Sequence, residues 1–419
     1  MPNQHHDHSP YALKPHTAST QADDDVDESQ PLIATDLELS HLAADWKAFW
    51  GILTGSQLHW LLVLAPLAVY VTLAKWDATY VFTLNFLALL PLANILGEAT
   101  EDLLSHMGHT VGSLVNASFG NAMEILIAIF ALRNGEVDLV QSSLIGSMLS
   151  NLLLVLGMCF VSGQLGGAHE SSFNLTGASI NMSLLFVASF AMLIPSYYIS
   201  MGGKFDDGQA VGDDRKASVL RLSRLTAVFL VLMYVQHLVF KLVTHRRVCA
   251  AVTRLNTHPH ETYMSLPGAM ALLLATTACV ACLSEFLVSS VDALTQSSGI
   301  PKSFLGIIVL PIVGNTVQHV EHFSALQGAF KNKMDLAMGV AVGSATQIML
   351  FVAPVCVLAG WVMDTPMTLA FNEFEAMTYI MSTILVYIIV ADGKSNWIEG
   401  SMLLTLYVLI ALSLLEIDI

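Results

Sequence analysis

Residues 112–124 read GSLVNASFGNAME, and residues 306–318 read GIIVLPIVGNTVQ. In both stretches a Gly-Asn pair begins eight residues after an earlier glycine. Three residues after each asparagine stands a side chain that carries oxygen, Glu124 in one stretch and Gln318 in the other. Agreement at this many fixed offsets, in distant parts of the chain, indicates an internal repeat.

The repeat continues beyond these two stretches. Asp138 precedes a Gly-Ser pair at 146–147 by eight residues, and Asp335 precedes a Gly-Ser pair at 343–344 by eight. The one misfit in spacing is an insertion of three residues in the connecting loop of the second copy. Each copy therefore extends over at least two consecutive elements.

The composition places these repeats in a membrane. Of 419 residues, 54% are hydrophobic and only 12% are charged. Soluble proteins carry about a quarter charged residues, and the apolar stretches of this chain are long enough to cross a bilayer. We therefore predict an all-α integral membrane protein with about eleven transmembrane helices. The expected spans are 57–76, 78–98, 111–132, 139–162, 175–199, 220–243, 266–288, 303–328, 335–361, 374–391 and 398–415.

The order of the spans predicts the architecture. The first copy of the repeat begins with the second span and the second copy with the seventh, so each unit contains five spans. After an odd number of crossings the second unit enters from the opposite side, as in the inverted repeats of secondary transporters. We predict one extra N-terminal helix followed by two inverted five-helix repeats. The expected segments are a disordered acidic and His-rich tail at 1–56, the extra helix at 57–76, repeat one at 77–243, a basic linker loop at 244–265 and repeat two at 266–419.

Glu124 is the charged side chain inside an expected span that most needs a partner. A charge at a helix centre costs about 2.5–3.5 kcal/mol on insertion scales, so we expect Glu124 to face the protein interior. Small neighbours such as Gly120 allow helices to approach closely and backbone carbonyls to line a cavity. A carboxylate, the amides of Asn121 and Asn315 and bare carbonyls would form the oxygen-rich surroundings that Ca²⁺ prefers.

Two further groups of polar residues have a functional and a structural interpretation. Ser147 and Ser344, with Gln347 about one turn beyond, could complete an oxygen shell, although small residues also serve helix packing in membranes. Glu98, Glu101 and Glu285 lie near the ends of the second and seventh spans, and Glu98 and Glu101 share a helix face. They would form an access path for protons or cations, unless they are ordinary interfacial acids.

Three stretches resemble the calcium/proton exchanger family, in particular its fungal vacuolar members. They are GEATEDLLSHMGHTVGSLVNASFGNAMEILIAIFAL at 97–132, SLIGSMLSNLLLVLGM at 143–158 and MDLAMGVAVGSATQ at 334–347. The resemblance covers roughly residues 45–419. It implies one helix plus two inverted five-helix repeats that exchange luminal protons for cytosolic Ca²⁺. The residues that it implies as cation ligands are Glu124, Asn121, Asn315, Ser147 and Ser344.

The resemblance also implies the partners and the location. Ca²⁺ and H⁺ would be transported substrates. No cofactor or nucleic acid is expected, and a homo-oligomer is possible. The protein would reside in a vacuolar or other internal membrane. No nucleophile elbow, phosphate loop or zinc signature occurs, so we expect no enzyme activity. A channel, or a scaffold that no longer transports, is the alternative from another class.

The chain departs from the family pattern at Gln318, where the second motif carries a glutamate. Two facing carboxylates would neutralise Ca²⁺ at low dielectric and accept protons once the ion leaves. With Gln318 one acid is missing, and Glu321, about one turn further, would replace it, with His319 and His322 as proton carriers. The alternatives are monovalent cation/proton exchange and a weakly transporting paralogue. The full predicted cation and proton site is Gly120, Asn121, Glu124, Ser147, Gly314, Asn315, Gln318, His319, Glu321, Ser344 and Gln347.

Overall fold

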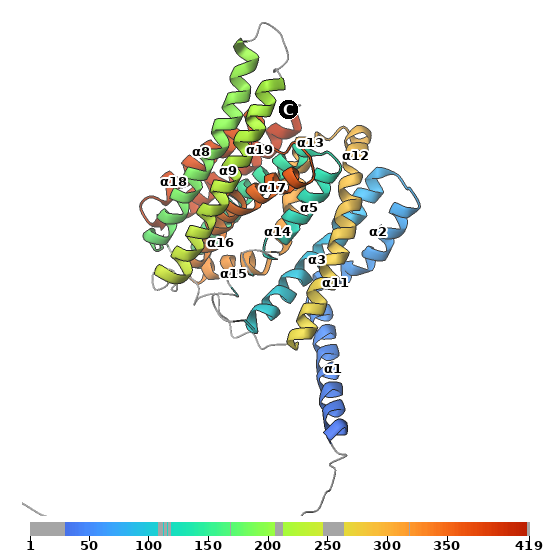
Figure 1. Ribbon diagram of the computed structural model, residues 1–419. Coiled ribbons are helices and arrows are strands. Elements are labelled where there is room, and N and C mark those ends of the chain that lie inside the picture. Colours follow the sequence, from blue (N-terminus) through green and yellow to red (C-terminus); the bar gives the residue numbers. More distant parts are fainter. Residues whose placement is uncertain are drawn as a thin grey trace, which may run out of the picture. The chain divides into compact units, whose positions relative to one another are not determined.

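The computed structural model describes residues 30–107, 112, 115, 119–167, 169–205, 213–245, 264–317 and 319–416, without the side chains of 30–42, 201–205, 213, 316–317 and 319–321. The chain divides into two compact units, Met1–Ala44 and Asp45–Ile419. The second unit holds the repeats (Figure 1). Its described part is helical apart from one short antiparallel pair, in which Ser171 lies opposite Ser395. The predicted all-α membrane fold is confirmed.

The described elements follow one another in this order. They are α1 (Gln30–Gly55), η1 (Gln57–Val63), α2 (Leu64–Leu73), α3 (Ala78–Ser105), α5 (Ala122–Arg133), α6 (Val137–Leu149), η2 (Ser150–Val155), α7 (Leu156–Leu165), β1 (Ser171–Ser172), α8 (Leu175–Phe205), α9 (Asp213–Val239), η3 (Phe240–Thr244), α11 (Leu266–Ser289), α12 (Val291–Ser298), α13 (Lys302–Phe304), η4 (Leu305–Val309), α14 (Leu310–Val317), α15 (His319–Phe330), α16 (Met334–Gln347), η5 (Ile348–Val352), α17 (Ala353–Val362), α18 (Glu373–Val390), β2 (Lys394–Ser395) and α19 (Trp397–Glu416).

Eight of the expected spans correspond to described helices that are long and apolar enough to cross a membrane. Several start where the sequence supplies a capping side chain. Asp77, Ser265 and Asn372 each accept a backbone N–H at the start of α3, α11 and α18, and a proline occupies the first turn of α11. These caps fix where the second, seventh and tenth spans begin.

The remaining three expected spans, 57–76, 111–132 and 303–328, are not single straight helices. The stretch 57–76 is divided between η1 and α2, and a bend of 98° separates it from the preceding helix Ala43–Gly55. Within 111–132 a turn at residues 120–121 precedes the twelve-residue helix α5. The stretch 303–328 is divided among α13, η4, α14 and α15. Interrupted helices inside a membrane need protein or water around their free backbone groups, so the two motif spans must lie in the interior.

The expected tail at 1–56 requires a correction. Residues 1–29 lie outside the described part, but α1 is helical from Gln30 to Gly55. Trp46, Phe49 and Trp50 recur at helical spacing, and their rings contact one another. Most of the expected basic linker, residues 246–263, also lies outside the described part.

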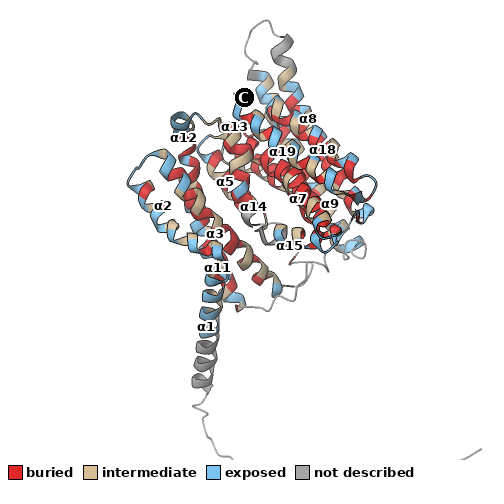
Figure 2. Ribbon diagram, turned by 180° about the vertical axis from the view of Figure 1, so that it is seen from behind, coloured by how far each residue is buried: buried red, intermediate tan, exposed pale blue. Residues whose placement is uncertain are grey.

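The fourth and ninth spans form the centre of the second unit. Helix windows in Val137–Leu165 and Met334–Val362 are 83% and 78% buried, against 17% for Asp214–Thr244 at the periphery. The same contrast is visible in Figure 2, where α7 is largely red and α9 carries more blue. Both central spans contain a π-helical segment, η2 and η5, shortly after the Gly-Ser pair. Such segments are rare and often mark functional sites.

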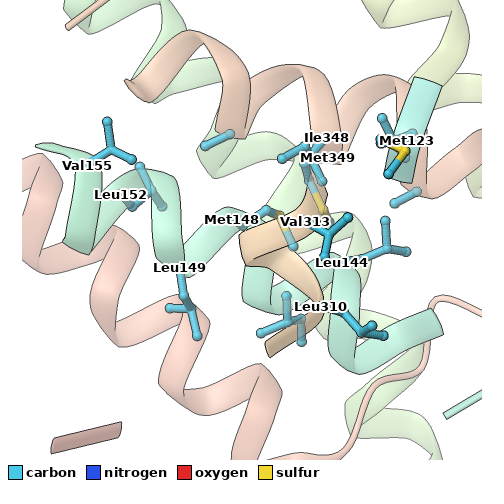
Figure 3. Packing of buried hydrophobic residues seen from close by; sticks show 14 of the residues in the cluster. Met123, Leu144, Met148, Leu149, Leu152, Val155, Leu310, Val313, Ile348 and Met349 are labelled. Atoms are coloured by element: carbon cyan, nitrogen blue, oxygen red, sulfur yellow. The ribbon is translucent and has the colours of Figure 1, made fainter. Parts of the chain in front are cut away.

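The two repeats share one apolar core. Leu144 and Met148 of α6 pack in the same cluster as Leu310 and Val313 of α14, as the close-up shows (Figure 3). In the same core, α3 and α11 lie side by side, as Figure 1 also shows. Residues of span four therefore meet residues of span eight, and the site is built where they meet.

Candidate functional site

Glu124 lies in the first turn of α5 and is 8% exposed. Neither of its carboxylate oxygens has a hydrogen-bond partner among the described residues. The side chain rests against Gly314 of the other repeat, where an added Cβ would lie 2.9 Å from Oε1. Gly314 thus leaves the space that the carboxylate occupies. The N-terminal end of α5 favours a negative charge there, although the burial opposes it.

Two hydrogen bonds join the motif of each repeat to the other repeat. Asn121 donates to Gln347 at 3.1 Å, and Asn315 donates to Ser150 at 2.9 Å. Ser150 follows Asp138 by twelve residues and Gln347 follows Asp335 by twelve, so the acceptors occupy equivalent positions of the two repeats. The inverted symmetry of the sequence is therefore present in the bonding of the site.

Asparagines of both repeats also carry buried polar atoms. Asn315 Oδ1 and both polar side-chain atoms of Asn151 are buried without a partner among the described residues, as are both oxygens of Glu124. Within the described part of the chain, no group of three or more His, Cys, Asp or Glu side chains could hold a metal ion. One carboxylate combined with neutral oxygens suits a hard cation that must also leave.

The predicted Gly-Ser pairs are placed differently from the asparagines. Ser147 and Ser344 are both buried, on α6 and α16. The hydrogen bonds of the two motif asparagines go instead to Ser150 and Gln347, three residues further along. Packing and ligation both remain interpretations of the two serines. Gly120 lies at the turn that precedes α5.

Part of the predicted site in the second motif lies outside the described residues. Gln318 lies outside the described residues, and the side chains of His319 and Glu321 are not described, although both residues belong to α15. The expectation that Glu321 replaces the missing acid therefore stays a prediction.

The expected access acids lie in two separate places. Asp102 accepts the backbone N–H of Met264, so the end of α3 meets the start of α11 and the two helices run in opposite directions. Glu98 is one turn before Asp102, whereas Glu285 is about twenty residues after Met264, or about 30 Å along the helix. Glu98 and Glu285 consequently belong to opposite halves of this helix pair.

The surroundings of these acids also differ. Glu98 accepts a hydrogen bond from Asn94 at 2.8 Å, and its side chain is 29% exposed. The Glu285 side chain is 45% exposed and lies 3.9 Å from the exposed Arg133. Glu101, on the same helix as Glu98, is partly buried. Glu98 therefore belongs to a polar network with Asn94 and His59.

Three polar residues near these sites had no role in the sequence prediction. Ser150 was overlooked because its counterpart, Gln347, is a different residue type. Glu375, near the start of α18, is buried and accepts a hydrogen bond from Ser142. His59 is buried beside Asn94. An acid or a histidine inside an expected apolar span was the available signal for Glu375 and His59.

The chain is similar in sequence and in structure to known membrane transporters. Residues 77–243 and 268–415 match the family described as sodium/calcium exchanger protein. The chain is 39% identical to a vacuolar calcium ion transporter of Schizosaccharomyces pombe, covering 87% of this chain and 85% of that protein. It is 38% identical to a Ca²⁺/H⁺ antiporter of Aphanothece halophytica, covering 84% and 94%. The structure of native YfkE superimposes with a TM-score of 0.68 at 35% identity, covering 85% of this chain and 100% of that chain.

Proposed function

Because the chain belongs to the sodium/calcium exchanger protein family, we propose that it exchanges Ca²⁺ for H⁺ across a vacuolar or other internal membrane by alternating access at Glu124. The protein is an integral membrane transporter and not an enzyme. The calcium transporter and the Ca²⁺/H⁺ antiporter named above support the choice of substrates. The vacuolar relative supports the location.

The observation that carries the proposal is the buried Glu124 with two oxygens that lack partners among the described residues. An ionised carboxylate in such a place is costly unless a cation or a proton compensates its charge. A bound cation and a bound proton use the same oxygens, so each excludes the other. Exchange of one for the other follows from this competition.

The residues at the site come from both repeats, which supports alternating access. Gly314 and Asn315 belong to the second repeat, whereas Glu124 and Ser150 belong to the first. Relative movement of the repeats would therefore change which side of the membrane reaches the carboxylate while the same groups hold the ion.

A second candidate function is exchange of a monovalent cation for protons. It is favoured by Gln318, since one formal charge at the site balances Na⁺ or K⁺ better than Ca²⁺. Replacement of the missing charge by Glu321 would restore the calcium function, and a weakly transporting paralogue would show neither activity strongly.

Transport by reconstituted vesicles with an acidic interior tests these functions. We expect uptake of radioactive calcium that depends on the pH gradient, and at least a tenfold loss in Glu124→Gln because the neutral amide can neither release a proton nor balance the cation. Glu170→Gln is the matched control, since Glu170 is an exposed acid paired with Lys394 away from the site. Calcium uptake no greater than that of empty vesicles, with proton efflux driven by Na⁺ or K⁺, would select the monovalent function instead.

A further inference from the structure

His59 links the helix outside the repeats to the access acid Glu98. It lies in η1, just after the 98° bend, and its side chain is 1% exposed. Its Nδ1 is 2.8 Å from the carbonyl oxygen of Ile52, and its Nε2 is 3.0 Å from the amide nitrogen of Asn94. The same nitrogen of Asn94 is 2.8 Å from Oε1 of Glu98. A continuous chain of hydrogen bonds therefore joins a buried histidine to a partly exposed carboxylate.

The hydrogen bonds fix where each proton lies. A carbonyl oxygen only accepts, so Nδ1 of His59 carries the hydrogen and donates it to Ile52. Asn94 has two N–H groups, and one donates to Nε2 of His59 while the other donates to Glu98. In this arrangement His59 is neutral, its Nε2 holds a lone pair and Glu98 is an acceptor.

One additional proton converts this arrangement into another. A proton on Nε2 would meet the N–H of Asn94, so the amide must turn its oxygen toward the ring. Nε2 of His59 lies only 3.9 Å from Oε1 of Glu98, which places a direct pair between imidazolium and carboxylate within reach of a small side-chain movement. The two arrangements differ by one proton and by the net charge presented at Glu98.

We propose that His59, Asn94 and Glu98 form a proton-holding relay, through which the helix outside the repeats sets the charge of the access path. The inference rests on the proposed antiport, because it assigns His59 as the positioning residue for an acid on the route to Glu124. With the proton held, the pair of His59 and Glu98 is neutral and does not attract a cation. After the proton leaves, the negative charge of Glu98 is available to an arriving cation.

Glu98 lies 3.9 Å from His59, whereas two other acids on the neighbouring helices accept backbone hydrogen bonds from elsewhere. Asp45 is engaged by the backbone N–H of Ser265 at 2.7 Å, and Asp102 is engaged by Met264 at 3.2 Å. Glu285 lies in the opposite half of the helix pair. The described titratable and charged groups on α1, α2, α3 and α11 are Asp45 and Lys47 of α1, Tyr70 of α2, Tyr80, Glu98, Glu101 and Asp102 of α3, and Cys279, Cys282 and Glu285 of α11.

A purely structural role for His59 would be to tether η1 to α3. The molecule contains a matched tether without a titratable group. Asn85 of α3 donates to the hydroxyl of Thr72 on α2 at 3.1 Å and is fully buried. Loss of the Asn85 bond reports what a lost contact between the extra helix and α3 does by itself.

The test compares the pH dependence of initial calcium uptake in vesicles for wild type, His59→Gln, Asn94→Asp and Asn85→Ala. Glutamine can bond to Asn94 but cannot take the proton. When the pH is varied on the side of the membrane that Glu98 faces, the uptake rate of His59→Gln should therefore lack one titration step between about pH 5 and 8. Aspartate at 94 favours the imidazolium, so Asn94→Asp should shift that step upward by about one pH unit. Asn85→Ala should keep the wild-type profile.

A second readout separates this inference from the transport function. The thermal midpoint of the purified protein is followed over the same pH range, without calcium. The difference between wild type and His59→Gln should change with pH, whereas the difference for Asn85→Ala should be constant. An absence of calcium uptake by the wild type overturns only the antiport. The relay is overturned if His59→Gln keeps the wild-type profile of both readouts, or if Asn85→Ala alters the profile as much.

Discussion

The two Gly-Ser pairs are equivalent in sequence but not in packing. On α6, Gly146 is buried against η4, and an added Cβ would lie 2.5 Å from Cα of Ile307. On α16, Gly343 is half-buried, and among the described residues no atom comes within 4 Å of such a Cβ. The glycines that begin the two motifs also differ in how closely they are packed. A Cβ on Gly306 would lie 2.6 Å from Ser142, whereas the nearest described atom to a Cβ on Gly112 is 3.7 Å away.

This difference shows that a repeated sequence is compatible with two packing arrangements. The α6 crossing is closed by direct contact of backbones, while the corresponding helix α16 keeps exposed surface at its glycine. Two exact copies in identical surroundings would give a symmetric structure without a preferred open side. Unequal crossings of like sequences are what a transporter needs if the repeats exchange roles during a cycle, and the predictions below test that inequality.

The largest effect is expected from Gly146→Ala. The new methyl group would overlap the backbone of Ile307, which cannot rotate away as a side chain could, so α6 and η4 must separate. We expect a loss of about 3 kcal/mol or more in stability, together with loss of calcium transport. Thermal unfolding of the purified protein measures the first effect and vesicle uptake the second.

Gly343→Ala is the control at the equivalent position. Alanine favours helix over glycine by up to about 1 kcal/mol, and the described surroundings leave room for the methyl group. Unchanged or slightly raised stability is therefore expected. Equal losses for the two substitutions would show that the crossings are equally tight and that the contrast between them is wrong.

The sequence predicted the repeats because their fixed offsets follow from chemistry that both copies share. It also placed eight spans, since hydropathy and capping residues such as Asp77 and Asn372 act locally. It did not predict the bend after Gly55 or the divided spans around Asn121 and Asn315. Hydropathy averages over a whole segment and is insensitive to a change of direction within it.

The candidate site was predictable in part for a related reason. Glu124, Asn121, Asn315 and Gln347 are unusual residue types in apolar surroundings, and the structure brings them to the contact between the repeats. Ser150 could be identified only by aligning the two copies residue by residue. Pairs such as His59 with Asn94 depend on contacts between distant segments, which a single sequence does not contain.

An intermediate loss of stability is expected at the hydrogen bonds of Asn121 and Asn315, which are equivalent in the two repeats. Ser150→Ala and Gln347→Ala each leave one buried asparagine amide without its acceptor, which costs about 1–3 kcal/mol. Similar losses in thermal stability, with weaker calcium affinity in vesicles, would show that the symmetry extends to energetics. Ser143→Ala is the control in the same span, because the Ser143 hydroxyl donates to the carbonyl of Val140 one turn earlier and, among the described residues, makes no side-chain bond to the other repeat. A loss for Ser150→Ala no larger than for this control would mean that the bond to Asn315 contributes little.

The smallest effect is expected at the ion cluster beside the closed crossing. Lys302, just before η4, pairs with Asp292 at 2.7 Å and with Glu136, just before α6. The position equivalent to Glu136 in the second repeat is Lys333, which is exposed, so this cluster has no counterpart of the same charge there. Lys302→Met should lower stability by about 1 kcal/mol or less, because the pair is partly exposed.

Although Lys302→Met should lower stability, it should raise the rate of transport. If the cluster helps to hold the α6 crossing closed, its removal eases opening at that end, and the initial rate of calcium uptake should rise, most clearly at low salt where ion pairs are least screened. Lys394→Met removes an exposed pair with Glu170 elsewhere and serves as the control. A rate that falls in Lys302→Met, or that rises equally in both variants, would show that the ion cluster does not hold the α6 crossing closed. The backbone contact at Gly146 would then be the cause of the asymmetry.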